Sequence, residues 1–206
     1  MIRMRRWFPA LRFLSAANLV TSLGAVAGLG SMAAGSIEAP RLAFTLLGGA
    51  LLCDRLDGPV ARRRGESSPF GAQLDSLADA VSFVAAPAVL ALQLHLLRGL
   101  GVAAGAVYAL AGLWRLAYFN VHRMSSVGAA RYFTGIPTTE AAAWFTVLGA
   151  LWAGLSRPVV PALFAADFVL GAVFMLANLR YPKDGIGGRI LLGLVPAALL
   201  LMWVKG

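Results

Sequence analysis

The chain has few of the residues that build disulfides and metal centres in soluble proteins. It contains one cysteine, Cys53, two histidines and nine acidic residues, and only 13% of its residues are charged. A single cysteine cannot form an intrachain disulfide. The histidines, His95 and His122, fall at opposite ends of expected membrane spans, so they cannot share one metal ion. Because acids are so scarce, the place where they gather is informative.

Long apolar runs make up most of the sequence. Its 206 residues are 59% hydrophobic and have a mean hydropathy of +0.76, which lies far outside the range of soluble globular proteins. Helices that cross a membrane satisfy their own backbone hydrogen-bonding groups, and the runs lack the alternation typical of a membrane β-barrel. We therefore predict an all-α, polytopic membrane protein in which residues 1–206 form one membrane-embedded domain.

Seven segments are candidates for crossing the bilayer, with six or eight spans as alternatives. They cover roughly residues 12–34, 41–65, 69–95, 99–121, 138–156, 158–178 and 190–204, the last of which is short and reaches the length of a span if residues 185–189 are included. The first segment has features of a signal peptide, but its polar residues Asn18, Thr21 and Ser22 favour a retained helix. Pro87 is expected to kink the third span.

Basic residues account for the net charge of +9 and are unevenly distributed. They gather before the first apolar run and after the second, fourth and sixth, whereas each alternate connection holds only one. This asymmetry follows the positive-inside rule, so we predict an inner (cytoplasmic) membrane protein with its amino terminus in the cytoplasm. The same distribution favours anionic lipid headgroups as partners, and not nucleic acid.

Four of the nine acids lie in one window, residues 54–79: Asp54, Asp57, Asp75 and Asp79. Each pair is spaced so that, on a helix, both side chains project from one face. The basic segment RRRGESSP between the pairs is turn-forming and long enough to reverse the chain. Two antiparallel helices would then place the four carboxylates opposite one another. Such an all-oxygen set favours hard divalent cations, Mg²⁺ or Mn²⁺.

Residues beside the carboxylates indicate a phosphate-containing ligand. Arg62 lies near the face of Asp57 and Gly58, and both a guanidinium and bridging metal ions match phosphate oxygens. Ser68 is placed to donate to a phosphate oxygen or to serve as an ordinary turn residue. Salt bridges between the aspartates and nearby arginines are the structural alternative. Glu140 and Asp167 lie in later spans without an evident partner.

The acidic window resembles the signature of the CDP-alcohol phosphotransferase family. Every fixed position is present in Asp54-x-x-Asp57-Gly58-x-x-Ala61-Arg62, eight residues, and Gly71-x-x-x-Asp75-x-x-x-Asp79. The resemblance implies a helical membrane enzyme, often a homodimer, with two divalent ions in a cavity that faces the cytoplasm. It also implies transfer of a substituted phosphate from a CDP-linked donor to an alcohol, with release of CMP.

A narrower resemblance is to the bacterial and archaeal phosphatidylserine synthases of that family. It rests on the blocks LDSLADAVSFVAAPA, WRLAYFNV, FTGIPTTEAA and NLRYPK and covers about residues 12–190. That branch usually has arginine where this chain has Tyr118. The resemblance implies CDP-diacylglycerol as donor and L-serine as acceptor. Glycerol 3-phosphate, an inositol phosphate or another amino alcohol are the alternative acceptors.

The family resemblance also implies roles for individual residues. The four aspartates would hold the two ions, and Asp79 would act as general base on the acceptor hydroxyl. The residues implied for the CDP-lipid are Gly58, Ala61, Arg62, Ser68, Gly71, Asn18 and Thr21. For Asn18 and Thr21, helix packing is the alternative. Arg115 and Arg131 are candidates for the acceptor carboxylate, or else positive-inside anchors.

A divalent-metal transporter is an alternative of a different class that would use the same carboxylates. It predicts metal flux into liposomes and no release of CMP. The arginine triplet at residues 62–64 disfavours a cation pathway beside it, because like charges repel.

Overall fold

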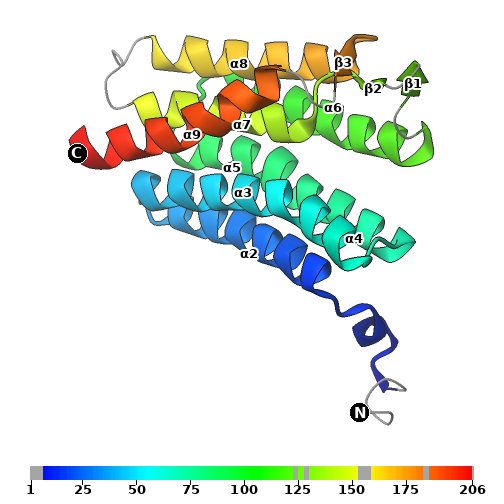
Figure 1. Cartoon of the computed structure of the whole chain (residues 1–206). Coiled ribbons are helices and arrows are strands. Elements are labelled where there is room, and N and C mark those ends of the chain that lie inside the picture. The colour runs from blue at the N-terminus through cyan, green and yellow to red at the C-terminus, as the bar shows by residue number, and fades with distance from the viewer. Residues whose placement is uncertain (1–6, 123–124, 128–129, 153–158, 183–185, 206) are drawn as a thin grey trace.

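The computed structural model describes residues 7–122, 125–127, 130–152, 159–182 and 186–205, which form a bundle of helices running side by side (Figure 1). A short 3₁₀ helix, η1 (Pro9–Phe13), precedes the bundle. The α-helices are α2 (Ala16–Ser36), α3 (Pro40–Arg64), α4 (Pro69–Asp79), α5 (Ala86–Gln93), α6 (Gly101–His122), α7 (Thr138–Leu151), α8 (Val160–Leu176) and α9 (Ile186–Lys205). η1 and the C-terminal end of α9 lie at opposite ends of the bundle.

Three helical segments of the described chain are long and apolar enough to cross a bilayer: Ala16–Ser36, Pro69–Gln93 and Gly101–His122. Val160–Leu176 and Gly193–Lys205 are shorter apolar helices. The prediction of an all-α, multi-pass membrane fold is therefore confirmed. The number of spans stays a prediction. α3 has 25 residues, but it carries Asp54, Asp57 and a basic last turn, and it is not among these apolar segments.

Pro87 is accommodated by a π-helical segment. α4, the π-helix η2 (Ala80–Ala85) and α5 form one continuous run, and Pro87 lies in the first turn of α5. Proline has no backbone N–H to donate to the preceding turn, and a local π-helical adjustment is one way to satisfy the backbone group that it leaves free. The π-helix begins directly after Asp79, so the distortion lies next to the acidic window.

A small antiparallel sheet, which the sequence did not predict, closes one end of the bundle (Figure 1). Its strands are β1 (Ser125–Val127), β2 (Ala130–Thr134) and β3 (Arg180–Pro182), in that order. In the β2–β3 register, Phe133 pairs with Tyr181 and Thr134 with Arg180. The sheet thus joins the connection between α6 and α7 to the segment that follows α8.

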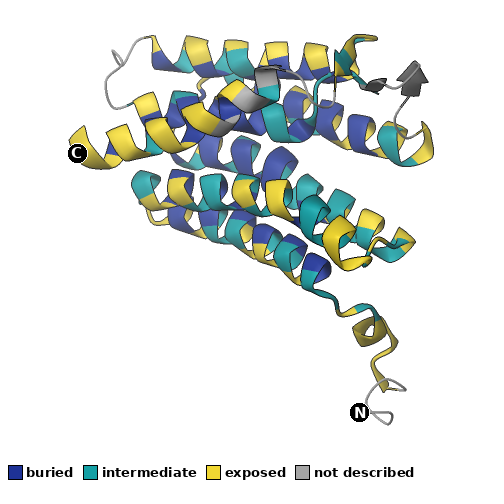
Figure 2. Cartoon of the chain, in the orientation of Figure 1, coloured by how far each residue is buried: buried dark blue, intermediate teal, exposed yellow. Residues whose placement is uncertain are grey.

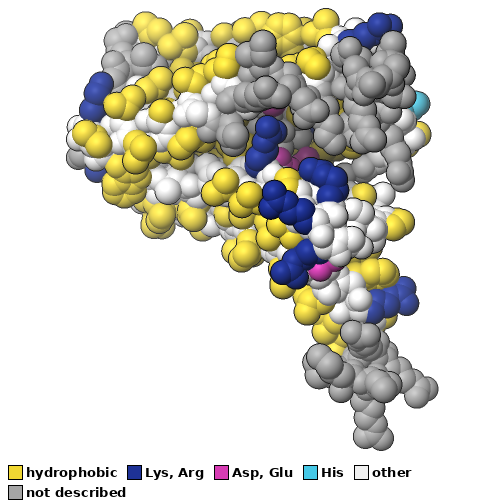
Figure 3. Space-filling view, in the orientation of Figure 1, with side chains coloured by type: hydrophobic (Ala, Val, Ile, Leu, Met, Phe, Trp, Pro, Cys, Tyr) yellow, Lys and Arg dark blue, Asp and Glu magenta, His cyan; other side chains and the backbone are white. Residues whose placement is uncertain are grey.

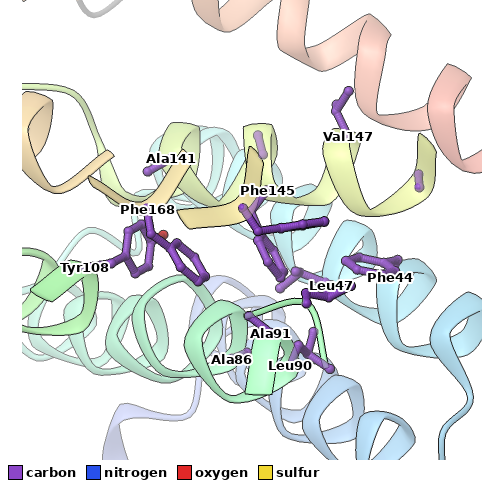
Figure 4. Close-up of a cluster of buried hydrophobic side chains, with 14 of the residues drawn as sticks. Phe44, Leu47, Ala86, Leu90, Ala91, Tyr108, Ala141, Phe145, Val147 and Phe168 are labelled. Atoms are coloured by element: carbon purple, nitrogen blue, oxygen red, sulfur yellow. The ribbon is translucent and has the colours of Figure 1, made fainter. Parts of the chain in front are cut away.

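Aromatic side chains form the centre of the core, where α3, α6, α7 and α8 meet (Figure 4). Phe145 stacks on Phe168 at a centroid distance of 5.4 Å and lies 5.7 Å from Phe44. Tyr108 packs on Phe168 and donates its hydroxyl to the carbonyl of Phe83 at 2.7 Å. The buried residues line the surfaces between helices, and the exposed ones face outward (Figure 2).

Small residues let α2 approach its neighbours closely. A Cβ atom on Gly24 would lie 3.1 Å from the Cβ of Cys53 on α3. A Cβ atom on Gly28 would lie 2.8 Å from the Cα of Ser82 in η2. Ser82 also donates to the carbonyl of Gly24 at 3.2 Å. These contacts fix α2 against both of the helical segments that carry the aspartates.

We expect Gly28→Val to destabilise the fold, because the added side chain must displace the backbone of η2. Overpacking of this kind typically costs about 1–3 kcal/mol. The same change at Gly193, where a Cβ would meet nothing within 4 Å, is the matched control. Thermal melting of both variants in detergent tests this expectation, and equal melting temperatures would contradict the packing argument.

Candidate active site

Three aspartates from two helical segments meet inside the bundle. Asp54 lies on α3, and Asp75 and Asp79 lie on α4. One carboxylate oxygen from each lies within 4.8 Å of the others, and each side chain is partly buried. The carboxylates of Asp54 and Asp79 are close enough for their charges to interact. Two carboxyl groups so close require a proton or a cation between them.

Asp57 lies outside this group of three and is held from the side of α2, while all four carboxylates line one cavity. Its Oδ2 atom accepts a hydrogen bond of 2.7 Å from Thr21 on α2, and the residue is buried. The reason is that α2 packs against both α3 and α4. Asp57 therefore faces α2 as well as the cavity that it shares with the other three aspartates.

The cluster opens into a cavity of about 750 Å³. Asp54, Asp57, Asp75 and Asp79 all line it, and its apolar part is formed by α3 and α9 through residues such as Gly48 and Leu199. The space-filling view shows acidic side chains between groups of Lys and Arg side chains on this face (Figure 3). The cavity therefore combines a charged region with an apolar one.

A second, smaller cavity of about 190 Å³ adjoins the first, and Asp57, Gly58 and Asp75 line both. Of the residues that the family resemblance implies for the CDP-lipid, this cavity is lined by Asn18, Thr21, Gly58, Ala61, Ser68 and Gly71. Arg62 lines the larger cavity, where a Cβ atom on Gly58 would lie 3.3 Å from its Nη1. The fold thus gathers these residues around two adjoining spaces.

Several of these residues also hold the local structure. Ser68 is the N-cap of α4, and its hydroxyl accepts from the backbone N–H of Gly71 at 3.1 Å. The side-chain amide of Asn18 donates to the carbonyl of Phe13 at 2.7 Å. A Cβ atom on Gly71 would lie 3.0 Å from Asn18 Oδ1, so α2 and α4 approach closely at their N-terminal ends. Ser68 therefore has a structural role in the turn before α4, and Asn18 has one in the packing of α2 against α4.

Glu66 belongs to the smaller cavity and was missed from the sequence. Its Oε2 atom accepts from the backbone N–H of Ala17 at 3.0 Å, at the first turn of α2. A carboxylate there satisfies an otherwise free donor and complements the helix dipole. The sequence gives no signal for this contact, because it joins residues that are far apart in the chain.

Arg115 is a buried cation on the wall of the larger cavity. Only 6% of its surface is exposed, and its Nε has no hydrogen-bond partner. Its guanidinium lies 5.6 Å from the ring centroid of Phe119 and 5.8 Å from that of Phe133. Its charge interacts with those of Asp79, Asp54 and Glu140. The side chain of Arg131, the other candidate for the acceptor carboxylate, lies outside the described part of the structure.

Tyr118, which stands where the serine-using branch usually has arginine, lies away from both cavities. It is half exposed and stacks on His122 at a centroid distance of 4.1 Å. Neither cavity includes it among its lining residues. The position of this departure from the branch pattern is therefore not part of the described walls of the two cavities.

Three further polar residues lie at the site. Thr138 Oγ1 is 3.5 Å from Asp79 Oδ2. Glu140 and Tyr181 line the larger cavity, and the Tyr181 hydroxyl is placed to donate to the Glu140 carboxylate. Burial and then this hydrogen bond raise the pKa of Tyr181, so the phenol stays protonated at neutral pH. Asp167, by contrast, lines neither cavity.

The cluster suits a divalent metal ion. Its donors are all carboxylate oxygens, the set that Mg²⁺ and Mn²⁺ prefer. The Asp54–Asp75–Asp79 separation of at most 4.8 Å allows one ion to contact more than one of them. Carboxylates gathered in a partly buried site also need a balancing charge.

Comparison with known proteins gives the class of the chain. The family model for CDP-alcohol phosphatidyltransferases matches residues 14–204. The chain therefore belongs to the CDP-alcohol phosphatidyltransferase family, and it is a membrane transferase that uses a CDP-linked donor. The same match favours an enzyme over a metal transporter.

Several curated relatives are similar over most of the chain. Archaetidylserine synthase of Methanothermobacter thermautotrophicus is 32% identical over 184 residues, which are 85% of this chain and 73% of that protein. CDP-diacylglycerol–serine O-phosphatidyltransferase of Helicobacter pylori is 34% identical over 171 residues, 81% of this chain and 71% of that protein. The Saccharomyces cerevisiae protein of the same name is 46% identical over 99 residues, which are 46% of this chain and only 35% of that protein.

A solved structure has the same fold. Mycobacterium tuberculosis phosphatidylinositol phosphate synthase, crystallised with CDP-DAG bound, superimposes with a TM-score of 0.57 at 23% identity. The match covers 91% of this chain and 92% of that one. The likeness supports the helical architecture over the part of the chain that it covers.

Proposed function

We propose that this chain transfers the phosphatidyl group of CDP-diacylglycerol to the hydroxyl of L-serine, forming phosphatidylserine and CMP. The observation that carries the proposal is the Asp54–Asp75–Asp79 cluster in one cavity with the buried guanidinium of Arg115. Carboxylates suit a metal-assisted phosphoryl transfer, and a buried guanidinium whose Nε has no hydrogen-bond partner suits an acceptor that bears a carboxylate. Relatives named as serine transferases add support.

The four aspartates would hold the catalytic ions. Two divalent ions, Mg²⁺ or Mn²⁺, bound by Asp54, Asp57, Asp75 and Asp79 would neutralise the donor diphosphate and the charge that develops on departing CMP. Thr21 would orient Asp57 through the hydrogen bond between their side chains. A hydrogen bond that orients a metal ligand in this way typically strengthens metal binding.

Asp79 would also act as the general base. Its carboxylate would take the proton of the serine hydroxyl as the serine oxygen attacks the phosphorus that bears diacylglycerol, and the bond from that phosphorus to CMP breaks. Thr138, 3.5 Å away, would restrict the orientation of this carboxylate. A base on the wall of a partly apolar cavity is also kept from bulk water.

The donor would lie across both cavities. Gly58, Ala61 and Gly71 offer small surfaces on which a nucleotide can approach the backbone. Arg62 and Ser68 would bind donor phosphates, and the Ser68 proton stays free because only its oxygen is used by Gly71. Asn18 and Thr21 complete the smaller cavity, and the apolar part of the larger one would receive the diacylglycerol end.

The acceptor carboxylate would bind Arg115, with Arg131 as a second candidate. A guanidinium binds a carboxylate through two parallel hydrogen bonds. Because Arg115 is buried and its Nε has no partner, an anion at that point would satisfy a donor that is otherwise costly to leave unpaired. Arg115 and Asp79 line the same cavity and their charges interact, so the carboxylate of one small molecule would bind Arg115 while its hydroxyl lies near Asp79.

The same proposal extends to the cellular setting. We place the chain in the inner, cytoplasmic membrane as one domain spanning residues 1–206, with the amino terminus and active site facing the cytoplasm. The uneven distribution of arginines and lysines among the connections supports this orientation. We also propose a homodimer, on the strength of the family resemblance.

An acceptor panel tests the proposed function. Purified protein supplied with CDP-diacylglycerol and Mn²⁺ or Mg²⁺ should release CMP when L-serine is added and should form phosphatidylserine. Glycerol 3-phosphate, an inositol phosphate and other amino alcohols are the comparison acceptors. Product from one of these, with none from serine, would show that the acceptor assignment is wrong.

A further inference from the structure

One acid on the wall of the larger cavity has no part in the chemistry proposed so far. Glu140 lies in the first turn of α7, is partly buried and lines the same cavity as Arg115 and the aspartate cluster. A carboxylate in such a position costs free energy unless it is hydrogen-bonded or paired with a cation. Its surroundings therefore indicate what it can bind.

Two elements hold Glu140 in place. Tyr181 lies beside it on β3, where the pairing of Tyr181 with Phe133 fixes the position of its backbone. On α9, a Cβ atom on Gly188 would lie 3.0 Å from Glu140 Oε1, so the absence of a side chain there leaves room for the carboxylate. Tyr181 stays protonated and acts as a donor, and one such hydrogen bond leaves further acceptor sites on the carboxylate free.

The cavity thus presents three charged features to a small ligand. Arg115 offers a cation, Glu140 an anion, and Asp79 the base, and the charge of Arg115 interacts with both acids. Arg55, an exposed residue of the same wall, also interacts with Glu140. A zwitterionic amino acid with a side-chain hydroxyl carries the complementary groups: a carboxylate, an ammonium and the hydroxyl that reacts.

We propose that Glu140, held by Tyr181, binds the ammonium group of the acceptor and makes the site selective for a zwitterionic amino acid. The inference rests on the proposed function and deepens it. Glu140 would attract an ammonium through a charge-assisted hydrogen bond and would repel a purely anionic alcohol such as a sugar or glycerol phosphate. The Glu140 carboxylate would then be the group that selects against anionic acceptors.

Steady-state kinetics of Glu140→Gln test this inference. Glutamine keeps the size of the side chain and an oxygen that can accept from Tyr181, but it removes the charge. We expect KM for L-serine to rise about 10- to 100-fold, the range for loss of a hydrogen bond to a charged group, with a smaller change in kcat. The matched control is Glu38→Gln, at an exposed glutamate in the connection between α2 and α3.

Comparison of two acceptors separates ammonium binding from a structural role. 3-Hydroxypropanoate has the hydroxyl and carboxylate of serine but no ammonium, so Glu140→Gln should reduce the wild-type preference for serine over it. Tyr181→Phe should weaken the preference less, because the carboxylate remains. An unchanged preference in Glu140→Gln would overturn the inference, as would loss of CDP-diacylglycerol binding, which would identify a structural role. Failure of the wild-type protein to use serine at all would instead contradict the proposed function.

Discussion

Asp79→Asn is expected to abolish phosphatidyl transfer while binding of CDP-diacylglycerol survives. Asparagine has nearly the same shape but cannot accept the serine proton, and it is a weaker ligand for a hard cation. Loss of a general base alone typically lowers the rate about 10²- to 10⁴-fold. CMP release measures the loss of transfer. Stabilisation of the protein against heat by added CDP-diacylglycerol measures the donor binding that remains.

Asp167→Asn provides the matched control for this variant. Asp167 is also a partly buried aspartate, in the apolar helix α8, with one carboxylate oxygen that has no hydrogen-bond partner, but it lines neither cavity. Its replacement should leave turnover close to that of the unaltered protein. Turnover at a normal rate in Asp79→Asn would remove the assignment of Asp79 as the base.

Asp54→Asn should weaken metal binding as well as catalysis. It removes one of the three carboxylates whose oxygens lie within 4.8 Å of one another. Even changes to groups that only orient metal ligands weaken metal affinity about 10- to 100-fold, so loss of a ligand should raise the half-saturating concentration of Mn²⁺ or Mg²⁺ by at least about 10-fold. Protein stripped with a chelator and titrated with each metal gives this value.

Thr21→Val supplies a graded comparison for the metal titration. Valine has the shape of threonine but lacks the hydroxyl that donates to Asp57. We expect a smaller shift in metal requirement than in Asp54→Asn, because Asp57 itself remains. An Asp54→Asn variant with the metal dependence of the unaltered protein would exclude Asp54 as a ligand.

Helical periodicity explains why much of the site could be anticipated from the sequence. Asp75 and Asp79 are one helical turn apart and project from one face of α4. Apolar runs, interrupted at turns rich in glycine and proline, likewise predicted the helical membrane fold. These are local patterns, and they depend only on the geometry of a helix.

Contacts between distant segments could not be anticipated. The sequence predicted two helices that face each other. In the structure a third helix, α2, packs against both α3 and α4, and Thr21 on α2 donates a hydrogen bond to Asp57. The strands β1 and β3 have only three residues each, too few for a recognisable alternation. Without the sheet there was no reason to place Tyr181 beside Glu140.

The location of the metal ions tests the central claim most directly. Crystals grown with Mn²⁺ and a CDP-linked lipid can be measured at the manganese absorption edge, where anomalous scattering locates the metal. We predict two peaks within about 2–2.5 Å of carboxylate oxygens of Asp54, Asp57, Asp75 and Asp79. Manganese bound elsewhere, with no peak among these four side chains, would contradict the account.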